Sequence, residues 1–141
     1  MRNLKLKQVL PVDDTETLQK VKEAPGLHAM GDLYQVQCDD RYLVDCKLLT
    51  EHCLKLVEDA GLSVVGHYFH QFDGGGGVTG MIVLAESHMS VHTWPEKRFV
   101  TIDVYVCSYT TDNRPKARKL YDSLLDTFQP EKHNAHFVER P

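Results

Sequence analysis

Residues 84–94 read LAESHMSVHTW and join two segments that have the pattern of β-strands. The bond between Glu86 and Ser87 follows an apolar run, and His88 and His92 come next. A serine after a strand is usually a turn residue. Two histidines four positions apart on a strand share one face without being neighbours. The residues alone therefore leave both a structural and a chemical role open for this stretch.

The next segment, residues 99–108 (FVTIDVYVCS), has the clearest strand pattern in the chain. Its aliphatic residues alternate onto one face, which places Cys107 on the opposite, more polar face. One alternative is that His88, His92 and Cys107 bind zinc. The spacing alone favours a plain structural role over a metal site.

Two segments have the periodicity of amphipathic helices. The first spans residues 43–60, with Gly61 suited to end it. The second begins at Asp112 or Asn113 as a cap and runs through Phe128. Their apolar stripes consist of Cys46, Leu49, Cys53, Leu56, Val57 and Ala60, and of Ala117, Leu120, Tyr121, Leu124, Leu125 and Phe128.

The remaining strands are expected at residues 28–36, 62–72, 78–86 and 135–139, with a further strand-like segment after Ser87. Four glycines between residues 74 and 77 suggest a hairpin connection, because no Lys-Ser/Thr ending and no helix follow as in a phosphate-binding loop. The resulting order predicts an α+β fold. It is a two-layer sandwich with a mostly antiparallel sheet and two main helices on one face.

The 141-residue chain is long enough for one domain, expected at residues 26–141 after an N-terminal arm at residues 1–25 with a short helix near residues 16–22. A net charge of −4 argues against nucleic acid as the partner. Neither a membrane span nor a signal peptide is expected. The four cysteines form no CxxC pair and are expected to be reduced thiols in the cytoplasm.

The ESH-x-S-x-HTWPE block, followed by VTIDVYVC, resembles the short bacterial and archaeal S-adenosylmethionine decarboxylases, a pyruvoyl-dependent family. The likeness runs from about Gly26 through the C-terminal helix and leaves the arm outside. It implies a proenzyme that cuts itself between Glu86 and Ser87 into fragments 1–86 and 87–141. It also implies a homodimer of cleaved protomers with active sites near the subunit interface.

In this family, the serine hydroxyl attacks the preceding carbonyl and converts the amide into an ester. Elimination and hydrolysis then leave a pyruvoyl group, here derived from Ser87. The resemblance assigns the base or proton relay to His92 and a supporting hydroxyl to Thr79. The pyruvoyl group forms a Schiff base with the amine of the small-molecule substrate, and Cys107 is the implied acid that reprotonates the carbon after loss of CO₂.

The resemblance places an adenine-stacking ring at Phe72 and a ribose-binding carboxylate at Glu96, and it implies no metal. The glycine loop is one residue longer than is usual in the family, and Lys97 and Arg98 follow WPE. These departures leave open a second substrate class, a free amino acid such as ornithine or arginine. A non-catalytic homologue is a third hypothesis, which the joint presence of Ser87, His92 and Cys107 disfavours.

Overall fold

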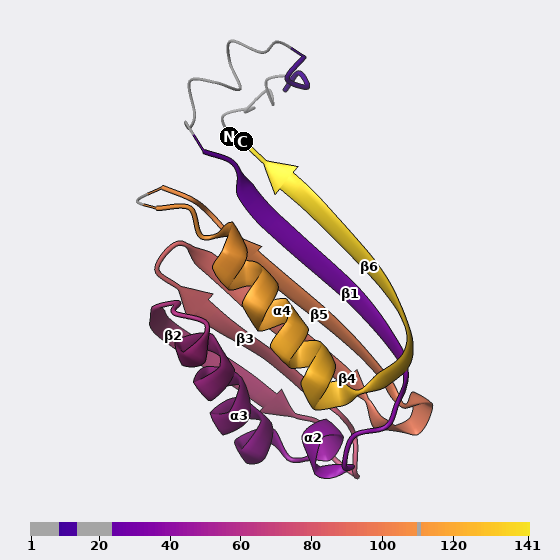
Figure 1. The fold of residues 1–141 in the computed structure, drawn as a ribbon. Helices are drawn as coiled ribbons and strands as arrows, with labels where there is room; N and C mark the ends of the chain where they lie inside the picture. The colour runs from indigo at the N-terminus through magenta and orange to yellow at the C-terminus, as the bar shows by residue number, and fades with distance from the viewer. Residues whose placement is uncertain (1–8, 14–23, 110) are drawn as a thin grey trace, which may run out of the picture.

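The computed structural model describes residues 9–13, 24–109 and 111–141, and the helix expected near residues 16–22 lies outside these ranges. The described chain forms one six-stranded sheet with its main helices on one face (Figure 1). The predicted α+β two-layer sandwich is confirmed.

All neighbouring strands of the sheet are antiparallel, in the order β2-β3-β4-β5-β1-β6. The strands are β1 (Gly26–Val36), β2 (Val64–Gln71), β3 (Val78–Leu84), β4 (Ser87–Trp94), β5 (Phe99–Val106) and β6 (Pro130–Arg140). Each expected strand is present, although β3 ends two residues earlier and β6 is longer than predicted. Strands β3, β4 and β5 are adjacent, so the end of β3, the start of β4 and the end of β5 meet at one edge.

The helices are α2 (Arg41–Val44), α3 (Cys46–Asp59) and α4 (Arg114–Phe128), with a 3₁₀ turn η1 (Pro95–Lys97). The prediction of one continuous helix from residue 43 is wrong, because Asp45 has an extended backbone (φ −103°, ψ 99°). The Asp45 carboxylate accepts a hydrogen bond from the Leu48 N–H at 3.1 Å. This is the usual bond of an N-cap aspartate, and it starts α3 one residue later. Gly61, with φ 82°, ends the helix as predicted.

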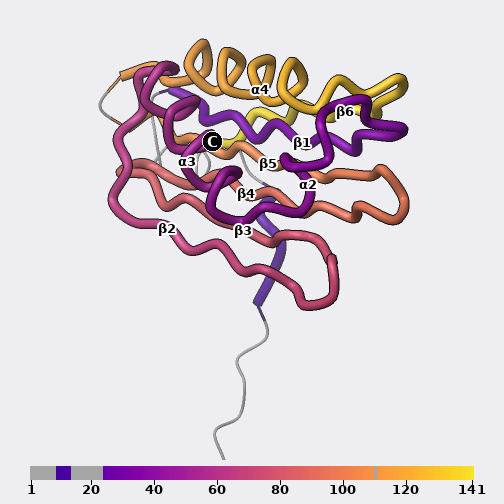
Figure 2. Tube along the Cα trace, turned by 90° about the horizontal axis from the view of Figure 1, so that it is seen from below, coloured from indigo at the N-terminus to yellow at the C-terminus, as the bar shows by residue number. Residues whose placement is uncertain are grey.

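The core lies between the sheet and the two long helices. Helix α4 covers β5 and β1, and α3 covers β2 and β3 (Figure 1); α4 lies along one side of the sheet in the turned view of Figure 2. The buried strand residues are Leu27, Ala29, Leu33, Val36, Val78, Ile82, Leu84, Met89, Val91, Val100, Ile102, Val104 and Val106. Among the described helices, none is both long and apolar enough to cross a membrane.

The other face of the sheet has no helix over it among the described residues, and it combines polar groups with large exposed side chains. Register pairs such as His28↔Tyr105, His88↔Tyr105 and Val83↔His88 fix which side chains share this open face. Its exposed large hydrophobics are Tyr34, Tyr68, Met81, Val83 and Val138. Large exposed hydrophobics gathered on one uncovered sheet face indicate an interaction surface.

The β2–β3 loop lies against the end of β4, and Gly77 makes this contact possible. A Cβ atom on Gly77 would lie 1.9 Å from the Thr93 carbonyl oxygen. The Thr93 hydroxyl accepts the Val78 N–H at 2.8 Å and donates to the Leu43 carbonyl at 2.7 Å, so it ties this loop to α2. By contrast, Gly74 has open space around it and needs only its positive φ of 68°.

We therefore predict that Gly77→Ala lowers the free energy of unfolding by about 1–3 kcal/mol, because the backbone of β4 must move away. Gly74→Asn is the matched control, since asparagine tolerates a left-handed backbone. Urea denaturation of both variants measures the difference. An equal loss of stability in the two variants would contradict the close contact at Gly77.

Candidate active site

The Glu86–Ser87 bond lies in the tight turn between β3 and β4. Leu84 pairs with Ser87 across the turn, and the Ala85 N–H donates to the Ser63 carbonyl at 2.9 Å. Ser87 has a φ of 152°, a backbone conformation that favours glycine. Such a residue stores strain on the order of 1–3 kcal/mol, and strain of this kind is concentrated at functional sites. The bond expected to break is therefore held in a fixed and strained turn.

The carbonyl of this bond has a backbone donor. The Cys107 N–H donates to the Glu86 oxygen at 2.8 Å. A hydrogen bond to this oxygen polarises the carbonyl and stabilises negative charge that develops on it when a nucleophile attacks. This donor is present because Cys107 directly follows β5, which pairs with β4 from Ser87 onward.

The Cys107 thiol lies on the polar side of β5, as the alternation predicts. Its Sγ is hydrogen-bonded to the Tyr105 hydroxyl at 3.4 Å. This hydrogen bond, together with partial burial, raises the pKa of Tyr105. The rings of His28 and His88 lie 5.6 and 5.8 Å from the Tyr105 ring, and the Arg140 guanidinium lies 4.5 Å from its centre. Tyr105 lies on β5 two residues before Cys107 and therefore shares its face.

Thr79 and His92 form a second group on the open face. They are register partners on β3 and β4, and the Thr79 Oγ1 lies 3.2 Å from the His92 Nδ1. The family resemblance implies that both residues serve the same step, and the structure brings them together. A hydroxyl bonded to an imidazole is an arrangement that can move a proton.

This pair nevertheless lies away from Ser87 of the same chain. His92 is five residues further along β4. At a rise of about 3.3 Å per residue this is a separation of roughly 16 Å. Phe72, which follows β2, and Glu96, in η1, also lie at the distant end of the sheet. The predicted site residues therefore form two groups at opposite ends of the sheet.

Aromatic rings line the open face at that distant end. The Trp94 and Phe99 rings are stacked at 5.3 Å, and Tyr34 lies 5.1 Å from Phe99. His92 lies 6.0 Å from Trp94, so this aromatic group, Tyr34, Trp94 and Phe99, adjoins the proton-transfer pair. Aromatic faces of this kind suit a planar base or a positively charged ligand.

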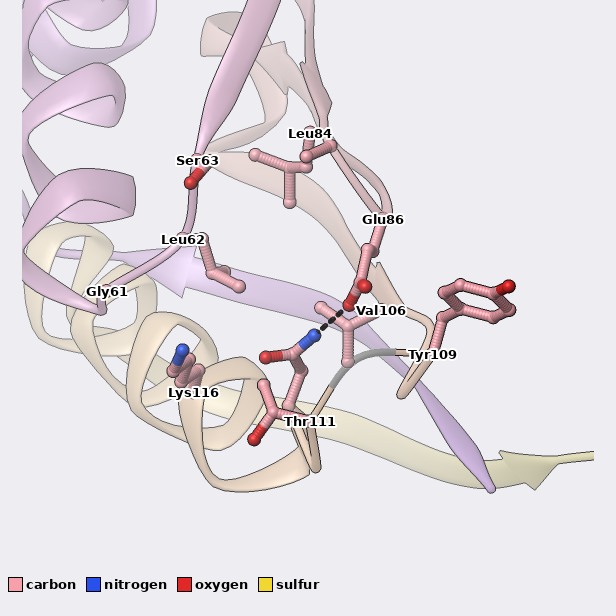
Figure 3. Close-up of a pocket in the computed structure, with 11 residues that line it drawn as sticks. Gly61, Leu62, Ser63, Leu84, Glu86, Val106, Tyr109, Thr111 and Lys116 are labelled. Atoms are coloured by element: carbon pink, nitrogen blue, oxygen red, sulfur yellow. Dashed lines mark hydrogen bonds between the residues drawn. The ribbon is translucent and has the colours of Figure 1, made fainter. Parts of the chain in front are cut away.

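We call the β3–β4 turn that holds Glu86 and Ser87 the cleavage turn, because the expected cut lies there. A cavity of about 410 Å³ lies on its helix side, between Glu86 and the start of α4 (Figure 3). Asn113 lines this cavity, and its side-chain amide donates to the Glu86 carboxylate and, at 2.9 Å, to the Cys107 carbonyl. Asn113 occupies the N-cap position of α4, as predicted, but its side chain makes no capping bond. Its contact with the cleavage turn was missed, because sequence patterns describe only local capping.

The zinc alternative has no support in the geometry. The described part of the chain contains no group of three or more histidine, cysteine or acidic side chains placed to hold a metal ion. His88 and His92 lie four residues apart on β4, and the Cys107 thiol contacts a tyrosine instead.

Comparisons of the sequence and the fold with known proteins identify one family. The family model described as S-adenosylmethionine decarboxylase matches residues 27–141. The S-adenosylmethionine decarboxylase proenzyme of Sulfurihydrogenibium sp. is 38% identical over 116 residues, covering 82% of this chain and 81% of that protein. The proenzyme of Archaeoglobus fulgidus is 32% identical over 115 residues, covering 82% of this chain and 96% of that one.

The crystal structure of the adenosylmethionine decarboxylase from Aquifex aeolicus superimposes with a TM-score of 0.73 at 32% identity, covering 84% of this chain and 92% of that one. The similarity thus extends over the sheet, both long helices and the cleavage turn. The chain belongs to the S-adenosylmethionine decarboxylase family.

Proposed function

We propose that this chain is a proenzyme that cleaves itself at Glu86–Ser87 and then decarboxylates S-adenosylmethionine to the aminopropyl donor of spermidine synthesis. The observation that carries this proposal is the strained Ser87 beside a carbonyl that accepts the Cys107 N–H. The relatives named above favour S-adenosylmethionine over a free amino acid such as ornithine or arginine.

The cleavage starts when the Ser87 hydroxyl attacks the Glu86 carbonyl carbon. The Cys107 N–H stabilises the charge on the carbonyl oxygen as the C–N bond breaks and an ester forms. The serine nitrogen takes up the hydroxyl proton. Removal of the Ser87 α-proton by a base then breaks the ester, and the upstream fragment leaves with the α-carboxylate of Glu86 as its new C-terminus. Hydration of the remaining double bond releases ammonia. Fragments 1–86 and 87–141 result.

The residues at the new N-terminus fit a pyruvoyl group, which the family forms from this serine and which supplies an electron sink for decarboxylation. Ser87 provides the carbon atoms at a position where the backbone is already fixed by Leu84 and Cys107. The Cys107 thiol is the proton donor to the substrate carbon. Its hydrogen bond to Tyr105 holds the thiol on the open face.

Self-cleavage gives the first test. The purified wild-type protein should contain two fragments that divide before Ser87, and Ser87→Ala should remain a single chain because the attacking hydroxyl is gone. Intact mass spectrometry measures both. Ser87→Cys is the matched control, since a thiol retains a nucleophile of similar size. A wild-type protein that remains full length after long incubation, or a cleaved Ser87→Ala protein, contradicts the proposal.

Cys107 should serve the two steps through different groups, its backbone N–H in the cleavage and its thiol in the decarboxylation. We expect Cys107→Ser to keep the cleavage, because it is the backbone N–H that donates to the Glu86 carbonyl, and this substitution retains it. Release of CO₂ from S-adenosylmethionine should fall by about 10²–10⁴-fold, the usual contribution of a general acid. Mass spectrometry and a CO₂ assay on the same preparation measure the two steps. Unchanged CO₂ release in this variant would remove the thiol from the mechanism.

We further propose that the active form is a homodimer in which the open faces of two sheets pack together. Its support is the uncovered face with five large exposed hydrophobics, of which Tyr68 is 70% exposed. A two-fold axis that lies between the two sheets and runs across their strands would pair opposite ends of the two sheets. The Thr79–His92 pair of one protomer would then lie near Ser87 of its partner.

This arrangement also explains where the substrate binds. Phe72 is half exposed at the end of β2, and Glu96 is exposed in η1. Both belong to the end of the sheet that a two-fold axis brings to the partner's cleavage turn. Phe72 stacks on the adenine, Glu96 accepts hydrogen bonds from the ribose hydroxyls, and the aromatic group attracts the sulfonium.

Mixed dimers test the shared site. A chain carrying Ser87→Ala still provides His92, and a differently tagged chain carrying His92→Ala still provides Ser87. Each should remain uncleaved when expressed alone, whereas co-expression should cleave the His92→Ala chain. Mass spectrometry distinguishes the tagged fragments. A His92→Ala chain that is never cleaved in the mixture would show that the site does not form across the dimer.

We also propose a reducing compartment, the cytoplasm, for the enzyme. All four cysteines are free thiols. Burial raises the pKa of the Cys53 thiol to about 12, so this residue is an inert core side chain, as its place in the helix stripe predicts.

A further inference from the structure

Asn113 is buried between the cleavage turn and the start of α4, with 5% of its surface exposed. Its side-chain amide nitrogen donates to two acceptors, the Glu86 carboxylate and the Cys107 carbonyl. An amide nitrogen carries two hydrogens, so one residue can satisfy both bonds. Because both partners only accept, the hydrogen-bonding chemistry fixes which end of the amide faces them.

These bonds close a ring around the reacting carbonyl. The Cys107 N–H holds the Glu86 carbonyl oxygen, and the Cys107 carbonyl and the Glu86 carboxylate are both held by Asn113. The Asn113 side chain thus links Cys107, which provides the backbone donor, to Glu86, whose carbonyl this donor stabilises. Figure 3 shows this link as the dashed line that ends on Glu86.

Helix capping does not account for this orientation. An asparagine at an N-cap normally accepts a bond from an N–H in the first turn, a contribution of about 0.5–2 kcal/mol. The Asn113 side chain makes no such bond. Instead the neighbouring Asp112 carboxylate accepts the Arg114 N–H at 3.1 Å. The Asn113 amide is directed at Glu86 and Cys107.

We infer that Asn113 is a positioning residue for self-cleavage: it holds the Glu86 carbonyl against the Cys107 N–H while the Ser87 hydroxyl attacks. This inference rests on the proposed self-cleavage. Asn113 touches neither the scissile carbonyl nor the hydroxyl, so it acts through its two partners. Loss of this alignment slows the reaction, since misplacement by about 1 Å can cost on the order of 10²-fold in rate.

Asn113→Asp is the sharpest test, because it keeps the shape and removes the donor. The new carboxylate repels Glu86 and cannot donate a hydrogen bond to the Cys107 carbonyl, yet a negative charge at the start of α4 is favourable for the helix. We expect cleavage to slow by about 10–100-fold, followed by gel electrophoresis during cell-free synthesis of the full chain. Thermal unfolding, measured for uncleaved chains that all carry Ser87→Ala, should stay within a few degrees.

A second substitution separates positioning from general damage. Adding Glu86→Gln to Asn113→Asp gives the turn an amide that can donate to the new carboxylate, so the cleavage rate should partly recover. Asp112→Asn is the matched control, because it changes the same loop and its pair with Arg114 but leaves Asn113 in place. Its cleavage rate should equal that of the wild type.

The outcomes separate the inference from the proposed function. Cleavage of Asn113→Asp at the wild-type rate overturns the positioning role and leaves self-cleavage standing. Slow cleavage that accompanies a large loss of stability, with no recovery on adding Glu86→Gln, also overturns it in favour of a structural role. A wild-type chain that never cleaves overturns the proposed function itself, and the inference with it.

Discussion

The hydrogen bond from the Cys107 N–H to the Glu86 carbonyl depends on the register of three neighbouring strands. Strand β3 must end and turn back as β4 where β5 also ends, or the donor and the carbonyl do not meet. The apolar face of these strands fixes that register, because a shift of one residue would turn Val100 and its neighbours out of the core. The core therefore positions the bond that we propose is broken, and the proposed chemistry depends on the packing.

The open face explains why the predicted acid–base residues do not gather around Ser87 within one chain. Side chains alternate along β4, so the histidines suited to acid–base chemistry all lie on the open side, spread over its length. A single protomer cannot bring the two ends of a straight strand together. Two sheets packed face to face can do so, and the uncovered apolar surface gives them a reason to associate. The proposed dimer thus accounts both for the uncovered sheet face and for the separation of Ser87 from the Thr79–His92 pair.

Strong periodicity allowed most of the fold to be predicted. The alternation in residues 99–108 set the faces of β5, and the two apolar stripes located the helices. The break at Asp45 was missed because the stripe continues through Leu43, although the acidic cap was visible in the sequence. The separation of His92 from Ser87 could have been derived from the strand spacing alone. The bonds of Asn113 could not, because they join segments far apart in sequence, whose approach only the folded sheet defines.

The strand order also explains how the proposed cleavage could occur without separating the two fragments. The fragment before the cut contributes β1, β2 and β3, and the fragment after it contributes β4, β5 and β6. In the sheet these strands interleave, so that β4 pairs with β3, and β1 lies between β5 and β6. Three of the five strand pairings therefore join one fragment to the other, and all three extend well beyond Ser87, so loss of the Ser87 nitrogen would leave them in place. The proposed cut would relieve the backbone strain at Ser87. It would also create a new N-terminus at a point that the rest of the sheet continues to hold in place.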